Sequence, residues 1–243
     1  MIAARKRAAA LGRRLRGRRV DENALRVIAD ASTSRMELWP RFVDAAGARE
    51  LAEIGVYRGG FAQRVLERCP AVATYYMVDP WRNLPDWRKP ANEPDRKFQR
   101  IFDQAMERTR PWEAKRVVLR GRTSEVIDRI PDGTLDFAYI DGDHTLRGIT
   151  IDLTRVYPKV REGGWIGGDD FVRSIWQHGD EYEPTLVFPY AVHFAEAVGE
   201  RIYALPFDQF LIEKRAPAEH EFIDLTQRYD ALDLRSQMRA GAV

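Results

Sequence analysis

Short apolar runs alternate with longer segments of helical spacing through most of the chain. The runs predict buried strands because each is short, apolar and bounded by turn or charged residues. They occupy residues 51–56, 73–78, 116–120, 135–140 and 165–168, and two more follow at 201–205 and 209–213. The segments between them predict helices at 61–69, 95–109, 123–129, 146–160 and 187–198, after a first helix at 21–38.

This alternation, which extends over about 165 residues, predicts an α/β fold with a doubly wound parallel sheet. The runs at 201–205 and 209–213 are close enough in sequence to pair as an antiparallel hairpin. Sheets of this kind bind ligands at the carboxyl ends of their strands, so candidate chemistry is expected there.

Charge is distributed unevenly along the chain. The 243 residues include 39 basic and 37 acidic side chains, but residues 1–20 hold eight basic side chains and no acidic one. The rest of the chain therefore carries six more acidic than basic side chains. The net charge of +2 is consequently a poor indicator of nucleic-acid binding, and we do not expect nucleic acid as a partner.

The basic arm, residues 1–20, is interpreted as a solvated helix. Contact with an anionic surface or an acidic partner is the alternative. The arm has no apolar run of the secretory type, although its arginine-rich composition also fits a mitochondrial transit peptide.

Composition excludes several classes of protein. An apolar content of 44% and an aromatic content of 11% exclude a disordered chain. No run approaches the roughly 18 apolar residues of a membrane span. The one cysteine, Cys69, excludes a disulfide framework and a cysteine-cluster zinc site, and predicts a cytoplasmic location.

Glycines and an acid follow the first two predicted strands. Gly55 and Gly59 come after the first strand, where glycine allows the backbone to approach a ligand. The alternative is a plain strand–helix turn, which would also use glycine. Asp79 follows the second strand, where a carboxylate can accept both hydroxyls of a ribose. The alternative for Asp79 is a simple Asp-Pro turn.

Four carboxylates and one imidazole collect after two further strands. They are Asp141, Asp143 and His144 after one strand, and Asp169 and Asp170 after the other. Clustered like charges raise one another's pKa values, and a cation would relieve that repulsion. All-oxygen ligands favour a hard ion such as Mg²⁺, whereas capping of the following helices is the alternative explanation.

Together these residues resemble the class I S-adenosylmethionine-dependent methyltransferases over about residues 48–215. The resemblance implies a Rossmann-like fold with a doubly wound, mostly parallel seven-stranded sheet, helices on both faces and an antiparallel last strand. It also implies S-adenosylmethionine as cofactor. The cofactor-binding residues that it implies are Glu53, Gly55, Tyr57, Gly59, Asp79, Ser124 and Asp141. Thr123 and Arg122 compete with Ser124 for the adenine side.

The pairing of Asp-Gly-Asp-His at 141–144 with Gly-Gly-Asp-Asp at 167–170 is more specific. It is similar to metal-dependent O-methyltransferases that act on sugars of macrolide and aminocoumarin antibiotics, and more loosely to catechol-type enzymes. In those families three acids hold Mg²⁺, which implies Asp141, Asp169 and Asp170 as ligands here. The general base falls on Asp143 in the sugar enzymes and on His144 in the catechol-type enzymes, and this chain offers both.

The expected function is therefore Mg²⁺-dependent O-methylation of a small hydroxylated acceptor, such as a sugar or vicinal diol. The alternatives are a metal-independent N- or O-methyltransferase, and a cofactor-binding or interaction module without turnover. The methyltransferase domain at 48–215 is expected to follow the basic arm at 1–20 and a helical extension at 21–47. A tail at 216–243 either docks on a second copy of the chain, giving a homo-oligomer, or frays.

Overall fold

The computed structural model describes residues 20–215 and 219–229. The predicted basic arm, apart from Val20, lies outside the described residues, and so does most of the predicted tail.

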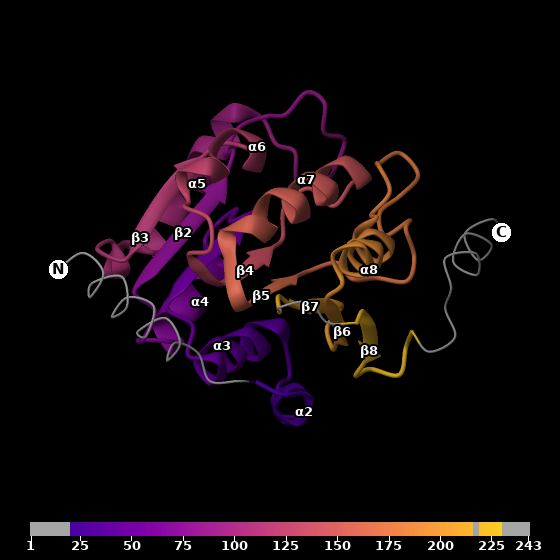
Figure 1. The fold of residues 1–243 in the computed structure, drawn as a ribbon. Helices are drawn as coiled ribbons and strands as arrows, with labels where there is room; N and C mark the ends of the chain where they lie inside the picture. Colours follow the sequence, from indigo (N-terminus) through magenta and orange to yellow (C-terminus); the bar gives the residue numbers. More distant parts are fainter. Residues whose placement is uncertain (1–19, 216–218, 230–243) are drawn as a thin grey trace.

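One eight-stranded sheet forms the centre of the molecule, with strand order β3-β2-β1-β4-β5-β7-β6-β8 (Figure 1). All neighbours pair in parallel except β7, which runs antiparallel to β5 and β6. The predicted doubly wound sheet and its antiparallel hairpin are thereby confirmed. The strands are β1 (Glu50–Ile54), β2 (Thr74–Asp79), β3 (Arg116–Arg120), β4 (Leu135–Ile140), β5 (Val160–Gly168), β6 (Arg201–Leu205), β7 (Gln209–Glu213) and β8 (Glu221–Asp224).

Helices cover both faces of the sheet (Figure 1). They are α2 (Glu22–Asp30), α3 (Arg35–Ala46), α4 (Gly60–Arg68), α5 (Asp95–Arg108), α6 (Thr123–Val126), α7 (Leu146–Val156) and α8 (Val187–Val198), with single 3-10 turns at Arg110–Trp112, Ile127–Arg129 and Tyr157–Lys159. Helices α2 to α5 pack in one apolar core and α6 to α8 in the other. Side chains alternate between the two cores along β4, because successive residues of a strand point to opposite faces: Phe137 and Tyr139 on one side, Ala138 and Ile140 on the other.

The helix predicted at 21–38 is in fact two helices. Asp21 caps the first by accepting a hydrogen bond from the backbone N–H of Ala24 at 2.9 Å. Ser32 ends it, because its hydroxyl donates to the carbonyl of Ile28 and the chain turns before α3. Apolar periodicity alone does not reveal this break, because apolar residues continue through both helices.

Trp39 holds helix α3 against the sheet. The indole is fully buried, its ring contacts Phe137 and Tyr139 of β4, and its Nε1 donates to Oε1 of Gln209 at 2.7 Å. Arg35 lies one turn earlier on the same face of the helix. The helical extension predicted at 21–47 is therefore part of the packed fold, and it carries Arg35 to the carboxyl end of β4.

Part of the predicted tail belongs to the sheet. Strand β8 pairs in parallel with β6 and adds an eighth strand to the seven that were predicted. Beyond β8 the buried side chain of Tyr229 packs on Phe171 and Phe188, and its hydroxyl donates to the carbonyl of Phe171. The short, half-exposed strand carries too few apolar residues to be recognised from its sequence.

Among the described helices, none is long and apolar enough to span a lipid bilayer.

The contact of Trp39 with Gly167 of β5 gives a stability prediction. A Cβ at Gly167 would overlap the Trp39 ring, so Gly167→Ala should lower the free energy of unfolding by about 1–3 kcal/mol. At Gly60 a Cβ would meet only the Arg108 side chain, at an ordinary 3.6 Å, so Gly60→Ala is the matched control. Urea unfolding measures both, and equal stability of the two variants would contradict this packing.

Candidate active site

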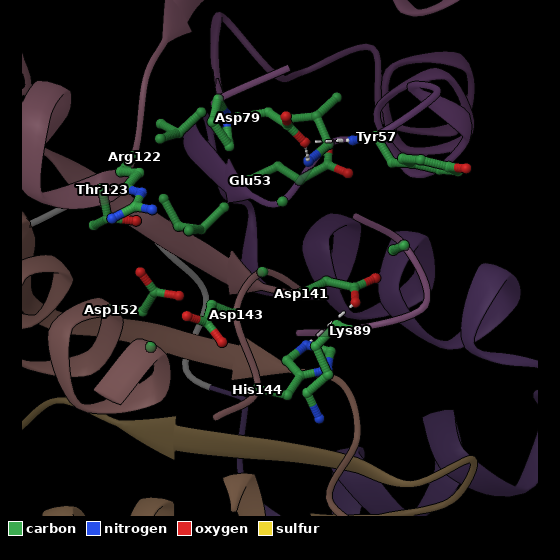
Figure 2. A pocket seen from close by; sticks show the side chains of 18 of the residues that line it. Glu53, Tyr57, Asp79, Lys89, Arg122, Thr123, Asp141, Asp143, His144 and Asp152 are labelled. Carbon is green, nitrogen blue, oxygen red and sulfur yellow. Dashed lines mark hydrogen bonds and ion pairs between the residues drawn. The ribbon is translucent and has the colours of Figure 1, made fainter. Parts of the chain in front are cut away.

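A cavity of about 680 Å³ opens at the carboxyl ends of β1, β2 and β4. The chain leaves β1 toward β2 on one side and returns to β4 on the other, so the cavity lies where the strand order reverses. Figure 2 shows Asp79 and Tyr57 along one part of its wall and Asp141, His144 and Lys89 along another. The site residues predicted from sequence thus gather around one cavity, apart from Gly59 and Asp169, which lie beside it.

The glycine loop after β1 closes tightly on the acids after β4. Gly55 has φ +88°, and a Cβ there would overlap the backbone carbonyl of Asp141. Gly59 also has a positive φ, +73°, and begins helix α4. At Gly55 only glycine tolerates both the left-handed conformation and this close approach, and at Gly59 the positive φ favours glycine.

Asp79 fastens this loop. One carboxylate oxygen accepts the backbone N–H groups of Val56 at 3.0 Å and Tyr57 at 2.8 Å, and the other accepts that of Trp81 at 2.7 Å. Burial raises the pKa of Asp79 to about 6, against the opposing effect of these hydrogen bonds. Asp79 is therefore a loop organiser as well as a wall of the cavity (Figure 2).

The other predicted cofactor residues line the same region. Glu53 is 2% exposed and accepts a hydrogen bond from the hydroxyl of Tyr75 at 2.8 Å. Burial raises the pKa of Glu53 well above its ordinary value. Arg122, Thr123 and Ser124 all border the cavity, and Thr123 is the first residue of α6.

The acids after β4 and β5 are engaged by side chains. Nη1 of Arg35 donates to Asp141 Oδ2 at 2.8 Å and to the hydroxyl of Tyr139 at 3.2 Å, and it forms an ion pair with Asp169. Gln209 donates to the other oxygen of Asp169. Burial raises the pKa of Asp141, and the nearby Arg35 opposes that shift only in part.

His144 and Asp170 form a hydrogen-bonded dyad. Nδ1 of His144 donates to Asp170, while Nε2 lies 3.6 Å from Asp141 Oδ1 and makes no hydrogen bond within the described part of the chain. Burial alone would raise the pKa of Asp170, but the hydrogen bonds from His144 and Gln177 and the nearby imidazoles together outweigh it and hold that pKa at about 2. The backbone of Asp170 is left-handed, with φ +57°, which is an uncommon conformation for a residue other than glycine.

Asp143 has different partners from His144. Its Oδ1 accepts hydrogen bonds from the indole Nε1 of Trp87 at 2.9 Å and from the backbone N–H of Thr145 at 3.0 Å. Trp87 lies in the loop after β2, so Asp143 anchors that loop over the cavity.

A chain of hydrogen bonds closes the end of the cavity nearest the acids. The buried Nζ of Lys89 donates to the Thr185 hydroxyl at 3.1 Å, which donates to Gln177 at 3.0 Å. Gln177 in turn donates to Asp170 at 2.7 Å. The loop after β2 and the loop after β5 are thereby joined over the site.

The three predicted magnesium ligands do not converge on one point. Asp141 and Asp169 face the same guanidinium, and Asp170 faces His144. No group of three or more histidine, cysteine or carboxylate side chains within residues 20–215 and 219–229 is arranged to hold a metal ion. These carboxylates, already engaged by Arg35 and His144, do not fit a magnesium site, and the predicted metal finds no support.

Comparisons with known proteins place this site in context. A family model described as a methyltransferase domain matches residues 52–171. That span contains the glycine loop, Asp79, the acids after β4, and Asp169 and Asp170 after β5. A comparison with curated protein sequences finds no match.

The chain contains a methyltransferase domain. Its fold resembles a protein from Staphylococcus aureus assigned as a caffeoyl-CoA O-methyltransferase (TM-score 0.56, 13% identity, 79% of this chain and 91% of that one). It also resembles the O-methyltransferase TomG from Streptomyces achromogenes in complex with SAM (0.54, 15%, 85% and 95%). A third similar structure is an O-methyltransferase from Bacillus cereus in complex with SAH (0.53, 16%, 79% and 90%).

Three cavity residues of this methyltransferase were not predicted. Arg35 lies in a helix far from the motifs, and Lys89 lies in a loop without periodicity. Asp152 lies on the inner face of α7, where a lone acid among apolar positions is the one available signal.

Asp152 gives a pH prediction for the methyltransferase. Burial raises its pKa to about 7 from an ordinary 3.8, although the Thr123 hydroxyl and the Asp143 backbone N–H donate to it. Between those two values the folded protein keeps a proton that the unfolded chain has lost. This group's contribution to stability therefore falls as pH rises through the window and stays low above it.

Asp152→Asn removes that titration while keeping the side-chain shape. When the pH is raised from about 5 to about 8, the free energy of unfolding of the variant relative to that of the parent protein should increase by about 2 kcal/mol. Urea unfolding at both pH values measures the difference. A stability difference that does not change with pH would contradict the raised pKa.

Proposed function

We propose that this enzyme transfers the methyl group of S-adenosylmethionine to a hydroxyl of a small acceptor, with His144 as general base. The observation that carries the proposal is the His144–Asp170 dyad at one end of a cavity whose other end holds the glycine loop and Asp79. A cofactor and an oriented base would then face each other across one cavity.

The cofactor half follows from the loop that Asp79 organises. Glycine-bounded turns bring backbone N–H groups close to a ligand, and Asp79 keeps unshared electron pairs for ribose hydroxyls. Gly55, Tyr57 and Glu53 would border the amino-acid part, and Ser124, beside Thr123 and Arg122, the adenine. Complexes of the similar structures with SAM and SAH support this assignment.

The chemical step requires a proton acceptor at the acceptor hydroxyl. Asp170 fixes the ring of His144 with hydrogen on Nδ1, which leaves the lone pair of Nε2 free to accept a proton. As the proton moves to Nε2, the hydroxyl oxygen attacks the methyl carbon, the carbon–sulfur bond breaks, and its electrons stay on sulfur. The products are the methyl ether, S-adenosylhomocysteine and protonated His144, whose charge Asp170 and Asp141 stabilise.

A hydroxylated acceptor such as a sugar or vicinal diol suits the polar end of the cavity. Lys89, Asp143 and His178 border that end with hydrogen-bonding groups. We route no step through magnesium, because the carboxylates that would bind it are paired with Arg35 and His144. Of the alternatives considered from sequence, the metal-independent methyltransferase is the one that this arrangement favours.

If His144 is the general base, its removal should lower turnover and leave cofactor affinity nearly unchanged. His144→Gln should lower turnover by about 10²–10⁴-fold, because proton transfer is lost, while the Kd for S-adenosylhomocysteine changes by less than about threefold. Formation of S-adenosylhomocysteine over a panel of sugars and catechols measures turnover, and calorimetry measures affinity. His193→Gln, on the exposed side of α8, is the matched control and should behave as the parent does. A larger turnover loss in Asp143→Asn than in His144→Gln would transfer the role to Asp143.

For Asp79 we expect the opposite, with cofactor affinity as the quantity that is lost. Asp79→Ala removes the acceptor of three loop N–H groups and the proposed ribose contact, so the Kd for S-adenosylhomocysteine should rise by at least about tenfold. Asp103→Ala, exposed on α5, is the matched control. Unchanged affinity in a folded Asp79→Ala protein would show that the cofactor does not bind at this loop.

A further inference from the structure

One guanidinium lies among the acids at the place where related motifs hold a metal. Nη1 of Arg35 contacts Asp141, Asp169 and the Tyr139 hydroxyl together. The contact is built into the fold, because Trp39 fixes the same helix one turn later through Gln209, and Gln209 also donates to Asp169. Arg35 therefore reaches the acids from a rigid element.

The charge balance of the carboxylate cluster explains why Arg35 lies there. Three carboxylates, Asp141, Asp169 and Asp170, lie in a partly buried cluster that needs compensating positive charge. Arg35 supplies one permanent charge to the first two, and His144 serves the third. One permanent cation and one imidazole hydrogen-bond donor, from different elements, thus engage the three acids that a divalent ion would otherwise hold.

We propose that Arg35 takes the place of a divalent cation in this enzyme, both neutralising Asp141 and Asp169 and presenting hydrogen-bond donors to the acceptor. The proposal rests on the proposed function. Arg35 borders the cavity, and its Nε and Nη2 make no hydrogen bond to any residue in the described part of the chain. Those free donors suit an acceptor oxygen adjacent to the hydroxyl that is methylated.

A guanidinium in place of a metal ion changes how the acceptor hydroxyl is activated. A metal ion lowers the pKa of a bound hydroxyl by direct coordination, whereas a guanidinium only donates hydrogen bonds. Removal of the acceptor proton therefore falls more heavily on His144. An arrangement of this kind needs Arg35 and the His144–Asp170 dyad together.

Manganese binding tests the proposal without knowledge of the acceptor. Mn²⁺ binding is measured by electron paramagnetic resonance on the full chain, for the parent protein, Arg35→Ala, Arg35→Gln and Arg35→Lys. We expect the parent and Arg35→Lys proteins to bind Mn²⁺ weakly. Arg35→Ala and Arg35→Gln should bind it at least about tenfold more tightly, because their carboxylates lose a positive partner. Arg41→Ala, exposed on the same helix, is the matched control and should behave as the parent does.

Thermal unfolding gives a second measurement. Without metal, Arg35→Ala should lower Tm by at least about 3 °C, because two carboxylates lose their partner. Millimolar Mg²⁺ should restore part of that loss in Arg35→Ala and leave the parent Tm unchanged. Arg35→Gln keeps most of the side-chain volume and provides the same comparison if Arg35→Ala does not fold.

Two results would overturn the proposal. One is tight Mn²⁺ binding by the parent protein that Arg35→Gln does not strengthen, and the other is a folded Arg35→Gln protein that gains no Mn²⁺ affinity. Titration with S-adenosylhomocysteine separates this inference from the proposed function. A protein that fails to bind S-adenosylhomocysteine but gains Mn²⁺ affinity on Arg35→Gln refutes the function and retains the role of Arg35.

Discussion

Mutual repulsion of carboxylates at the ends of neighbouring parallel strands is the constraint around which this structure is organised. Asp141 follows strand β4, and Asp169 and Asp170 follow the adjacent strand β5. The glycine loop after β1 comes so close to Asp141 that its Gly55 has no room for a side chain. Such a cluster is stable only with positive partners. Arg35 supplies positive charge to Asp141 and Asp169, and His144 donates a hydrogen bond to Asp170. Each contact also fixes the position of a group that borders the cavity.

Helix α3 consequently has two roles, core packing and contact with the acids, and the residues that fulfil them lie one helical turn apart. Its second turn packs Trp39 into the core against Gly167, and its first residue, Arg35, contacts Asp141 and Asp169. Gln209 joins the two, because it accepts from Trp39 and donates to Asp169. Packing and site chemistry are therefore coupled, and a change in how α3 rests on the sheet would move a charge inside the site.

Most of the fold could be predicted from sequence because strand and helix periods are local signals. Strands β3, β4, β6 and β7 match the predicted runs, and the strand-end acids gather because parallel strands share one edge. Arg35 could not be predicted, because its contact with Asp141 spans 106 residues and depends on how a separate helix packs. The roles of Asp143 and His144 were equally beyond reach, because only the folded chain shows that one binds Trp87 and the other Asp170.

Strand β8 has a consequence for how this protein is handled. Its pairing covers the outer edge of β6, and Tyr229 just beyond it holds the carbonyl of Phe171, the residue after Asp170. A recombinant fragment cut at residue 215 would expose an unpaired strand edge, which promotes self-association. It would also release the segment next to the His144–Asp170 dyad. Such a fragment would keep the matched methyltransferase region and still be a poor representative of the enzyme.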